Sequence, residues 1–540
     1  MNSSSHFAQI PKAQLPRSSF DRSFSHKLTM DAGMLVPCFL DEVLPGDTMN
    51  LQTNMFVRLA SPLTVPIMDD MFVDVQYFFV PSRLLWDNWT KFQGEQRSPG
   101  DSTDFLVPQI EVLDGDYEVG GLADCFGLPP CNDDTPGFGW VYNANALPFR
   151  AYNMIWNEWY RDQNLQSAAF SYYGDDVYTI ADYPLLPRGK RHDYFTSCLP
   201  WPQKGPGVEI SLGGSAVVSG ELGYLAVGSS GKVPQIGAQA SGGTTHYLTA
   251  GPYVGGDIGL GFKMKVPDAA GSYKNELTAD LSGATPISIN SLREAIQLQR
   301  LLERDARGGT RYTEMLRAHF GVVSPDASLQ RPEYLGGSSN PIVINPVAQT
   351  SSTDSETPQA NLSAWAAAGF SNAPIVKSFT EHGYVLGLAS VRANLTYQQG
   401  VHRMWSRRSR FDFYLPVLAH LGEQAVLNKE IYMSITQAKN NAAFGYQERF
   451  AEYRYMPSRI SGHFRSTSPT PLDIWHLSQE FAAPPPLNAA FIKESPPIAR
   501  VSAVGNVGIK NQQFLADFYF KFKSVRVMPT YGVPGMMDHF

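Results

Sequence analysis

A two-residue alternation of apolar and polar residues marks the stretch "TMNLQTNMFVRLA", Thr48 to Ala60. One side carries the apolar residues Met49, Leu51, Met55, Val57 and Leu59. The other side carries the polar residues Asn50, Gln52, Asn54 and Arg58. This period is typical of a β-strand with one buried face and one wet face. The pattern therefore predicts a strand whose apolar face packs against a hydrophobic core.

Similar alternation recurs near both ends of the chain. "DDMFVDVQYFFVP" (69–81) follows the first strand, and "FLADFYFKFKSVRVMP" (514–529) places Phe514, Phe518, Phe520 and Phe522 on one face. After Ser524 the parity reverses, which predicts a β-bulge there. The segments 378–397 and "RFDFYLP" (410–416) are also strand-like. Strands at both ends with long connections between them predict a mainly β protein, a Greek-key or jelly-roll sandwich carrying insertions.

Three helices are predicted. Ser291 and Glu294 form a capping box at the start of an apolar-periodic segment that ends at Gly308-Gly309. A short helix over "RYTEMLRAHFG" stops at Gly321. "YNMIWNEWYRD" (152–162) is the third candidate, and its aromatic residues suit a core.

Two segments lack a strong pattern. Residues 205–283 hold 18 of the 46 glycines, so we expect short strands and no independent core there. Residues 336–376 are rich in small polar residues and are predicted to be a flexible loop. The expected division is an N-terminal arm (1–47), a first part of the sandwich (48–204), the glycine-rich insertion (205–283), a helical insertion (284–335), the polar loop (336–376) and the remaining sandwich with a C-terminal arm (377–540).

Composition narrows the class of protein. The 540 residues carry a formal net charge of -7, which argues against a simple electrostatic nucleic-acid binder. The four cysteines are too few to staple the chain and form no CxxC pair, so reduced thiols are expected. The first residues contain no apolar h-region, and no apolar run reaches transmembrane length. These features predict synthesis in a cytoplasm without membrane insertion or export.

Candidate chemistry is sparse. The sequence contains no GxxxxGK[ST], HExxH or GxSxG motif and no dinucleotide-binding loop. His420 and Glu423 could share a helical turn, but a third metal ligand is not visible. We therefore predict no enzymatic activity, no catalytic or metal-binding residues and no cofactor.

Several long stretches carry a family resemblance. "AQIPKAQLPRSSFDRSFSHKLTMDAGMLVPCFLDEVLPGDT", "NSLREAIQLQRLLERDARGGTRYTEMLRAHFGV", "RMWSRRSRFDFYLPVLAHLGEQAVLNKEIY" and "FGYQERFAEYRYMPSRISGHFRS" resemble the major capsid protein of Microviridae, in the gokushovirus branch. The resemblance runs from residue 7 almost to the C-terminus. It implies a single viral jelly roll, an eight-stranded antiparallel β-sandwich with long inter-strand insertions and few short helices.

The resemblance also implies a function. Sixty copies would assemble, with pentamers as intermediates, into a T=1 icosahedral shell around a circular single-stranded DNA genome of a small tailless phage. Expected partners are other phage structural proteins and a receptor on the bacterial surface. The resemblance further implies that the protein assembles in the cytoplasm of the host bacterium and becomes part of the virion. Residues 205–283 would correspond to a protrusion at the three-fold axes, with Tyr224, Tyr247 and Tyr253 as host-contact candidates.

Basic residues near an aromatic residue suggest contacts with single-stranded DNA, through phosphate pairing and base stacking. The candidates are Lys12, Arg17, Arg22 and Lys27 in the first thirty residues, and Arg403, Trp405, Arg407, Arg408 and Arg410 in "HRMWSRRSR". Ion pairs between subunits are an equally good interpretation of these arginines. The arm 2–47, proline-punctuated and polar up to Met30, is predicted to cross onto neighbouring subunits.

Two other classes of protein remain as alternatives. A carbohydrate-binding or carbohydrate-active β-sandwich would share the predicted fold, but the sequence shows no export signal and no plausible carboxylate pair. A cytoplasmic nucleic-acid-binding module would need a basic face, which the acidic balance disfavours.

Overall fold

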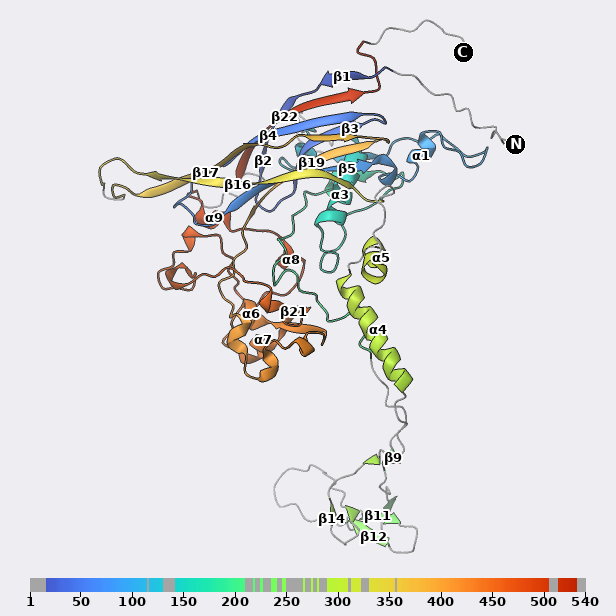
Figure 1. Cartoon of the computed structure of the whole chain (residues 1–540), viewed down its shortest axis with the longest axis vertical. Helices are drawn as coiled ribbons and strands as arrows, with labels where there is room; N and C mark the ends of the chain where they lie inside the picture. Colours follow the sequence, from blue (N-terminus) through green and yellow to red (C-terminus); the bar gives the residue numbers. More distant parts are fainter. Residues whose placement is uncertain are drawn as a thin grey trace. The chain divides into compact units, whose positions relative to one another are not determined.

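A computed structural model of the chain divides into two compact units, residues 1–202 with 308–540 and residues 203–307. It describes residues 16–113, 116–129, 141–208, 217–218, 224–226, 235–239, 245–248, 266–267, 273–274, 279–280, 289–308, 312–321, 330–354, 357–504 and 513–531. Figure 1 shows the first unit built around one large sheet.

The sheet of the first unit has ten antiparallel strands. Its main path runs β1-β22-β4-β17-β16-β5-β19-β3, with β2 beside β22 and β18 beside β4. The strands are β1 (Ser18–Asp21), β2 (Phe24–Met30), β3 (Val36–Val43), β4 (Thr48–Leu59), β5 (Met71–Pro81), β16 (Glu333–Ala348), β17 (Leu362–Ser371), β18 (Ile375–Ser378), β19 (Gly383–Ala393) and β22 (Phe514–Arg526). Strands close in the sheet are thus far apart in sequence, as a jelly roll requires.

The sheet curls until its two ends meet. Phe39 on β3, the last strand of the path, contacts Phe520 and Phe522 on β22, with ring centroids 5.1 and 5.5 Å apart. The concave face encloses a core formed by residues of β3, β4, β5, β17, β19 and β22. The mainly β jelly-roll prediction is confirmed.

The strand predicted over 48–60 is β4. Its five predicted apolar residues are buried, while Asn50 and Arg58 are exposed. The strand predicted over 69–81 is β5, and its alternation describes only one of its two faces. Phe78 and Val80 on the second face are buried as well. That second face packs against a second core, which includes α3 (Leu147–Ile155) and its continuation Trp156–Tyr160. The helix predicted over 152–162 is therefore present, and it begins earlier.

The predicted β-bulge after Ser524 is wrong. The register of β22 against β4 runs without a shift from Phe514↔Leu59 to Val525↔Thr48. Ser524 keeps the inward parity and is buried. Val525 and Val527 after Ser524 are only half-buried, and Val527, which follows the strand, lies so close to Gly46 that a Cβ added to that glycine would be 2.7 Å from it.

The prediction that residues 2–47 cross onto neighbours is wrong for the described part of that arm. β1 and β2 pair with β22 of the same chain, for example Phe24↔Phe520 and Met30↔Phe514. Met30 and Phe39 lie in the central core. Residues 1–15, including Lys12, lie outside the described residues.

The flexible loop predicted over 336–376 is also wrong. Most of this segment forms β16, β17 and β18, and β16 pairs along its length with β5 and then β17. Ala364, Ala366 and Ala368 of β17 face the core, so the inward side chains are too small to produce a strong hydrophobic alternation. Neighbouring strands supply the pairing that the local sequence does not reveal.

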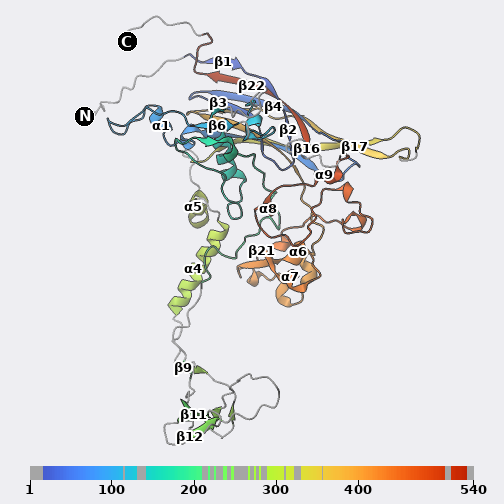
Figure 2. The same cartoon turned by 180° about the vertical axis from the view of Figure 1, so that it is seen from behind.

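Two long excursions leave the sheet of the first unit, and they occupy different places in Figures 1 and 2. Residues 85–182 carry α1 (Trp89–Phe92), β6 (Gln109–Leu113), α2 (Leu122–Cys125), β7 (Val141–Asn145), α3 and β8 (Tyr178–Thr179). Residues 400–470 carry β20 (Glu423–Leu427), α6 (Asn428–Ile431), α7 (Gln437–Asn441) and β21 (Ala443–Glu448). A third core underlies the second excursion.

The second unit contains α4 (Ile289–Arg307), two residues longer at its start than the predicted capping box. Its described strands have two to five residues each, as expected for the glycine-rich segment: β9 (Val217–Val218), β10 (Tyr224–Ala226), β11 (Gln235–Gln239), β12 (Thr245–Leu248), β13 (Val266–Pro267), β14 (Tyr273–Lys274) and β15 (Ala279–Asp280). α5 (Tyr312–Phe320) belongs to the first unit and ends at Gly321, whose φ is +71°. The expected domain boundaries stay a prediction.

Candidate interaction surface

The arginine-rich segment 402–414 is held by two short capped turns. In the first, η7 (Arg403–Ser406), the Met404 N–H donates to Nδ1 of His402 at 3.2 Å. In the second, η8 (Arg410–Asp412), the Asp412 carboxylate accepts the backbone N–H groups of Arg408 and Ser409 at 2.9 and 2.7 Å. These bonds favour the ionised form and lower the pKa of Asp412 to about 2. These hydrogen bonds therefore hold the segment in two consecutive turns.

The strand predicted over "RFDFYLP" is consequently wrong. Ser409-Arg-Phe-Asp412 is a capping box, with the serine and the aspartate each bonding the other's backbone. The serine–aspartate spacing of this box lies in the same residues as the alternation of aromatic side chains that predicted a strand. Phe411 lies in this turn and Phe413 directly follows it, so the two rings do not share one face of a strand, and both are more than half exposed.

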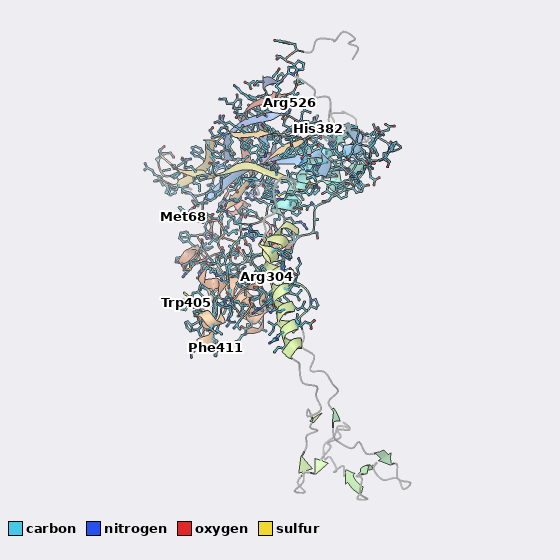
Figure 3. All side chains as sticks on the ribbon, turned by 45° about the vertical axis from the view of Figure 1, so that its right-hand side comes forward. Met68, Arg304, His382, Trp405, Phe411 and Arg526 are labelled. Atoms are coloured by element: carbon cyan, nitrogen blue, oxygen red, sulfur yellow. The ribbon has the colours of Figure 1, made fainter. Side chains whose placement is uncertain are left out.

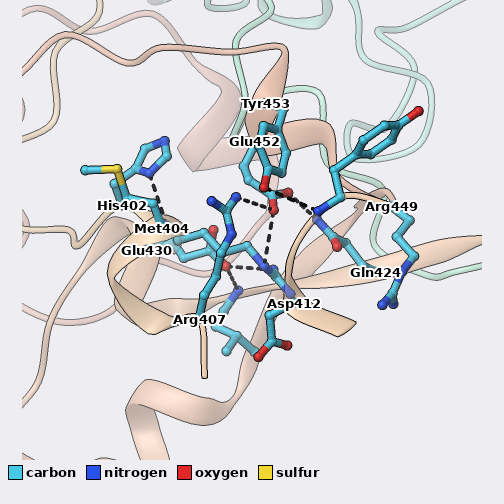
Figure 4. A network of polar contacts seen from close by, with 12 residues as sticks. His402, Met404, Arg407, Asp412, Gln424, Glu430, Arg449, Glu452 and Tyr453 are labelled. Atoms are coloured by element: carbon cyan, nitrogen blue, oxygen red, sulfur yellow. Dashed lines mark hydrogen bonds and ion pairs between the residues drawn. The ribbon is translucent and has the colours of Figure 1, made fainter. Parts of the chain in front are cut away.

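Two of the candidate arginines are committed to buried carboxylates (Figure 4). Arg403 donates to Glu430 at 3.0 Å and to the carbonyl of Ala425 at 2.8 Å, and Arg407 donates to Glu452 at 3.2 Å. The side chains of both glutamates are at most 3% exposed. Removing either cation would leave a buried charge without compensation, a change that is strongly destabilising. Arg403 and Arg407 thus stabilise the subunit itself.

Further contacts complete this network. Tyr194 donates to Glu430 at 2.9 Å, and the Gln424 amide donates to Glu452 at 2.7 Å. Arg407 also stacks on the ring of Tyr453, 4.3 Å from its centroid. Burial raises the pKa of Glu430, although the nearby Arg403 acts in the opposite direction. The network joins the turns to β20, α6 and the chain after β21.

The remaining candidates of this segment face solvent. Arg408 and Arg410 are exposed, and within the part of the chain that the structure describes neither guanidinium has a partner. Trp405 is 74% exposed and Phe411 is 63% exposed, and Figure 3 shows both on the outside of the excursion. The four arginines, which the sequence does not distinguish, therefore form two pairs. Arg403 and Arg407 are the inner pair, and Arg408 and Arg410 are the outer pair.

The N-terminal candidates lie elsewhere, on the sheet. Arg22 forms a two-pronged ion pair with Asp41 at 2.8 and 2.5 Å. Arg17 donates to the carbonyl of Gly46 and to the Thr48 hydroxyl, and Lys27 lies 3.3 Å from Asp517 at the surface. The described N-terminal cations are therefore paired within the subunit, on a different part of it from the arginine-rich segment.

A hollow of about 460 Å³ lies beside the buried network. Its lining includes Tyr455, Arg459 and Arg465, together with Met433 and Trp405. Within the described residues, no group of three or more His, Cys, Asp or Glu side chains could hold a metal ion.

Comparison with known proteins decides the family. The model of the family described as "Capsid protein (F protein)" matches residues 8–536. The chain belongs to this capsid protein family. It is 46% identical over 553 residues to capsid protein VP1 of Bdellovibrio phage phiMH2K, covering 99% of this chain and 98% of that protein. Capsid proteins VP1 of Chlamydia phage 1 and Spiroplasma virus 4 are 41% and 36% identical, each over 98% of this chain and 97% of theirs.

Family membership gives this capsid protein a structural role and makes it a component of a virion. It also confirms the resemblance on which the sequence analysis relied. The carbohydrate-active alternative has no support in these comparisons. Among the described residues, no helix is both long and apolar enough to cross a bilayer.

The host-contact candidates of the capsid protein lie in the second unit. Tyr224 on β10 and Tyr247 on β12 are both in register with Gly237 of β11, which runs between them. Tyr253 lies outside the described residues. The backbone thus places two of the three tyrosines opposite the same residue of one small sheet.

Proposed function

We propose that sixty copies of this capsid protein assemble, through pentamers, into a T=1 icosahedral shell that encloses a circular single-stranded DNA genome. The curled sheet supports this proposal, because it is a closed body from which long excursions can reach neighbours. Assembly would take place in the cytoplasm of a bacterial host with other phage structural proteins. The role needs no catalytic group and no cofactor. Electron microscopy of purified particles tests it, and open sheets or free monomers would contradict it.

The DNA contact that we propose uses the outer residues of the arginine-rich segment. Arg408 and Arg410 are exposed and unpaired in the described part of the chain, and Trp405 beside them is 74% exposed. A free guanidinium can bind phosphate, while an exposed indole can stack on an unpaired base. Arg403 and Arg407 have an indirect role, since they hold these residues in place through Glu430 and Glu452.

The test separates the two pairs of arginines. Particles with R408S/R410S should package less DNA and should lose part of the salt dependence of DNA retention, because two phosphate contacts are removed. The matched control is R58S/K521S, which removes two exposed cations from the outer face of the sheet. Unaltered packaging in R408S/R410S would rule out the DNA role. An R407S variant is unsuitable, because it would disturb the fold through Glu452.

A second proposal concerns host attachment. We propose that residues 205–283 form a surface protrusion that contacts a bacterial receptor. The support is that this segment belongs to a compact unit of its own, with strands too short to form a sandwich. Replacing 205–283 by a short Gly-Ser linker should leave the first unit folded and abolish adsorption of the particles. Undiminished adsorption would place the receptor contact elsewhere.

A further inference from the structure

Charge is distributed very unevenly along this chain. Residues 85–182 contain 16 Asp and Glu but only 4 Lys and Arg, a net charge of -12. Residues 400–470 contain 10 Lys and Arg and 5 Asp and Glu, a net charge of +5. The rest of the chain carries 29 of each sign. We call the two excursions the acidic segment and the basic segment.

The two segments occupy separate regions of the first unit. The acidic segment begins at the end of the sheet marked by α1, where Trp89 contacts His382 with ring centroids 5.5 Å apart. The basic segment carries α6, α7 and β21, and Figures 1 and 2 both show it apart from α1. Figure 3 likewise separates His382 from Trp405 and Phe411. The described residues of the two segments therefore lie on two different parts of the first unit.

The acidic segment presents unpaired carboxylates and also strongly exposed apolar side chains. Asp87 and Asp104 are exposed, and their carboxylates have no partner among the described residues. Leu106 and Val119 of the same segment are 85% and 75% exposed. Covering such side chains with a partner surface is favourable, because it removes apolar area from water.

The basic segment presents the complementary surface. Arg459 and Arg465 are exposed at the hollow of about 460 Å³, and no carboxylate within the described residues pairs with either guanidinium. Met456, two residues before Ser458 at the rim of this hollow, is 72% exposed. The surface combines cations, a concave site and an exposed apolar side chain.

We propose that the acidic segment of one capsid protein docks on the basic segment of a second copy. The inference rests on the shell proposed above. Two different surfaces meet in such a contact, so it is heterologous, and repeating it forms a ring where its rotation closes, as the proposed shell requires. Opposite charges steer the two copies into register and penalise contacts between like surfaces.

A second copy is the occupant that the charges favour. Each copy carries one acidic and one basic segment, so each added subunit presents a new acidic and a new basic surface. DNA could bind the basic segment but would leave the acidic segment unpaired. Binding of DNA by Arg459 and Arg465 would instead appear as loss of DNA from otherwise normal shells.

The test is a charge swap in the full-length protein. D87K/D104K and R459E/R465E each reverse two exposed charges, and each should reduce the yield of closed shells at least about tenfold at low salt. The combined variant restores opposite signs and should return the yield to within about threefold of native. R58E/K521E, which makes the same charge change on the outer sheet face, is the matched control. Circular dichroism checks that every variant is folded.

The outcomes are distinct. Failure of the combined variant to recover would overturn the inference, as would an equal loss of shells in R58E/K521E. If R459E/R465E forms normal empty shells that lack DNA, these arginines face the genome and the inference is wrong. If the native protein itself forms no closed shells, the proposed function fails. If the native protein forms normal shells and the charge-swap variants form them in the same yield, only the docking inference is wrong and the proposed function stands.

Discussion

Asp41 on β3 lies 3.3 Å from the guanidinium of Arg526 on β22, and this ion pair joins the two ends of the curled sheet. The same carboxylate is paired with Arg22, which follows β1. Arg526 in turn reaches Asp47 at 3.1 Å. Because β3 is the last strand of the path and β22 the second, these pairs close the jelly roll next to the Phe39–Phe520 contact.

Removing the Asp41 charge should weaken this closure. D41N leaves Arg526, whose side chain is 17% exposed, and Arg22 without their shared anion. We expect the free energy of unfolding of the isolated subunit to fall by about 2–4 kcal/mol, as for other partly buried pairs that lose one partner. The matched control is D517N, whose pair with Lys27 is solvent-exposed and should change stability by less than about 1 kcal/mol. Urea unfolding measures both, and equal effects would contradict the role of Asp41.

Truncation tests the corrected view of the N-terminus. Deleting residues 2–28 removes β1 and most of β2, and it exposes the edge of β22 that pairs with Phe24 and Leu28. Met30 and Phe39 would lose their covering. We expect insoluble or molten subunits, not folded subunits that fail to assemble. A soluble truncated subunit with native near-ultraviolet circular dichroism would restore the crossing-arm hypothesis for this segment.

Strands with strong alternation could be predicted from sequence, and others could not. β4 and β22 have one wet face and large inward side chains, so their periodicity is clear. β19 is buried throughout and shows no two-residue period, yet it lies within the segment 378–397 that was predicted to be strand-like, and that prediction is confirmed. β17 buries mainly alanines, so it shows no period of large apolar residues and was not predicted. The 410–416 turns were missed because a capping box and an aromatic alternation overlap in the same residues.

The candidate site was predicted only in part. Spacing identified the arginine-rich segment, but it could not show that Arg403 and Arg407 face Glu430 and Glu452, which are 27 and 45 residues further along. Pairing over such separations is set by tertiary structure. The exposed pair, Arg408 and Arg410, has no local feature that distinguishes it from the inner pair.

Glu430 should contribute a measurable pH dependence. Burial raises its folded-state pKa above 4.5, so its contribution to stability is fully present below pH 4.5 and is lost as the pH rises through the folded-state pKa. E430Q removes this titration, and Arg403 keeps Glu452 at 3.9 Å. We expect the stability of E430Q to fall less than that of native protein as the pH rises from 4.5 to 7. Urea midpoints at several pH values measure this, and parallel curves would contradict it.

E452Q is the matched comparison for that variant. It leaves Arg407 without an anion in a position where its side chain is only 12% exposed. The expected loss is about 3 kcal/mol near neutral pH. A neutral effect of E452Q would show that stacking on Tyr453 and Phe413 suffices to hold Arg407.

Gly400 gives the sharpest steric test of the site. A Cβ added there would lie 1.9 Å from the backbone carbonyl oxygen of Glu430, and backbone cannot move aside as a flexible side chain can. G400A should therefore shift Glu430 away from Arg403 and cost about 3 kcal/mol or more, the upper range for overpacking. G100A is the matched control, because nothing lies within 4 Å of its added Cβ. Since Arg403 precedes the exposed arginines, G400A should also increase proteolysis within residues 403–414, which limited trypsin digestion would detect. Native stability and an unchanged cleavage pattern in G400A would show that this close approach does not hold the segment in place.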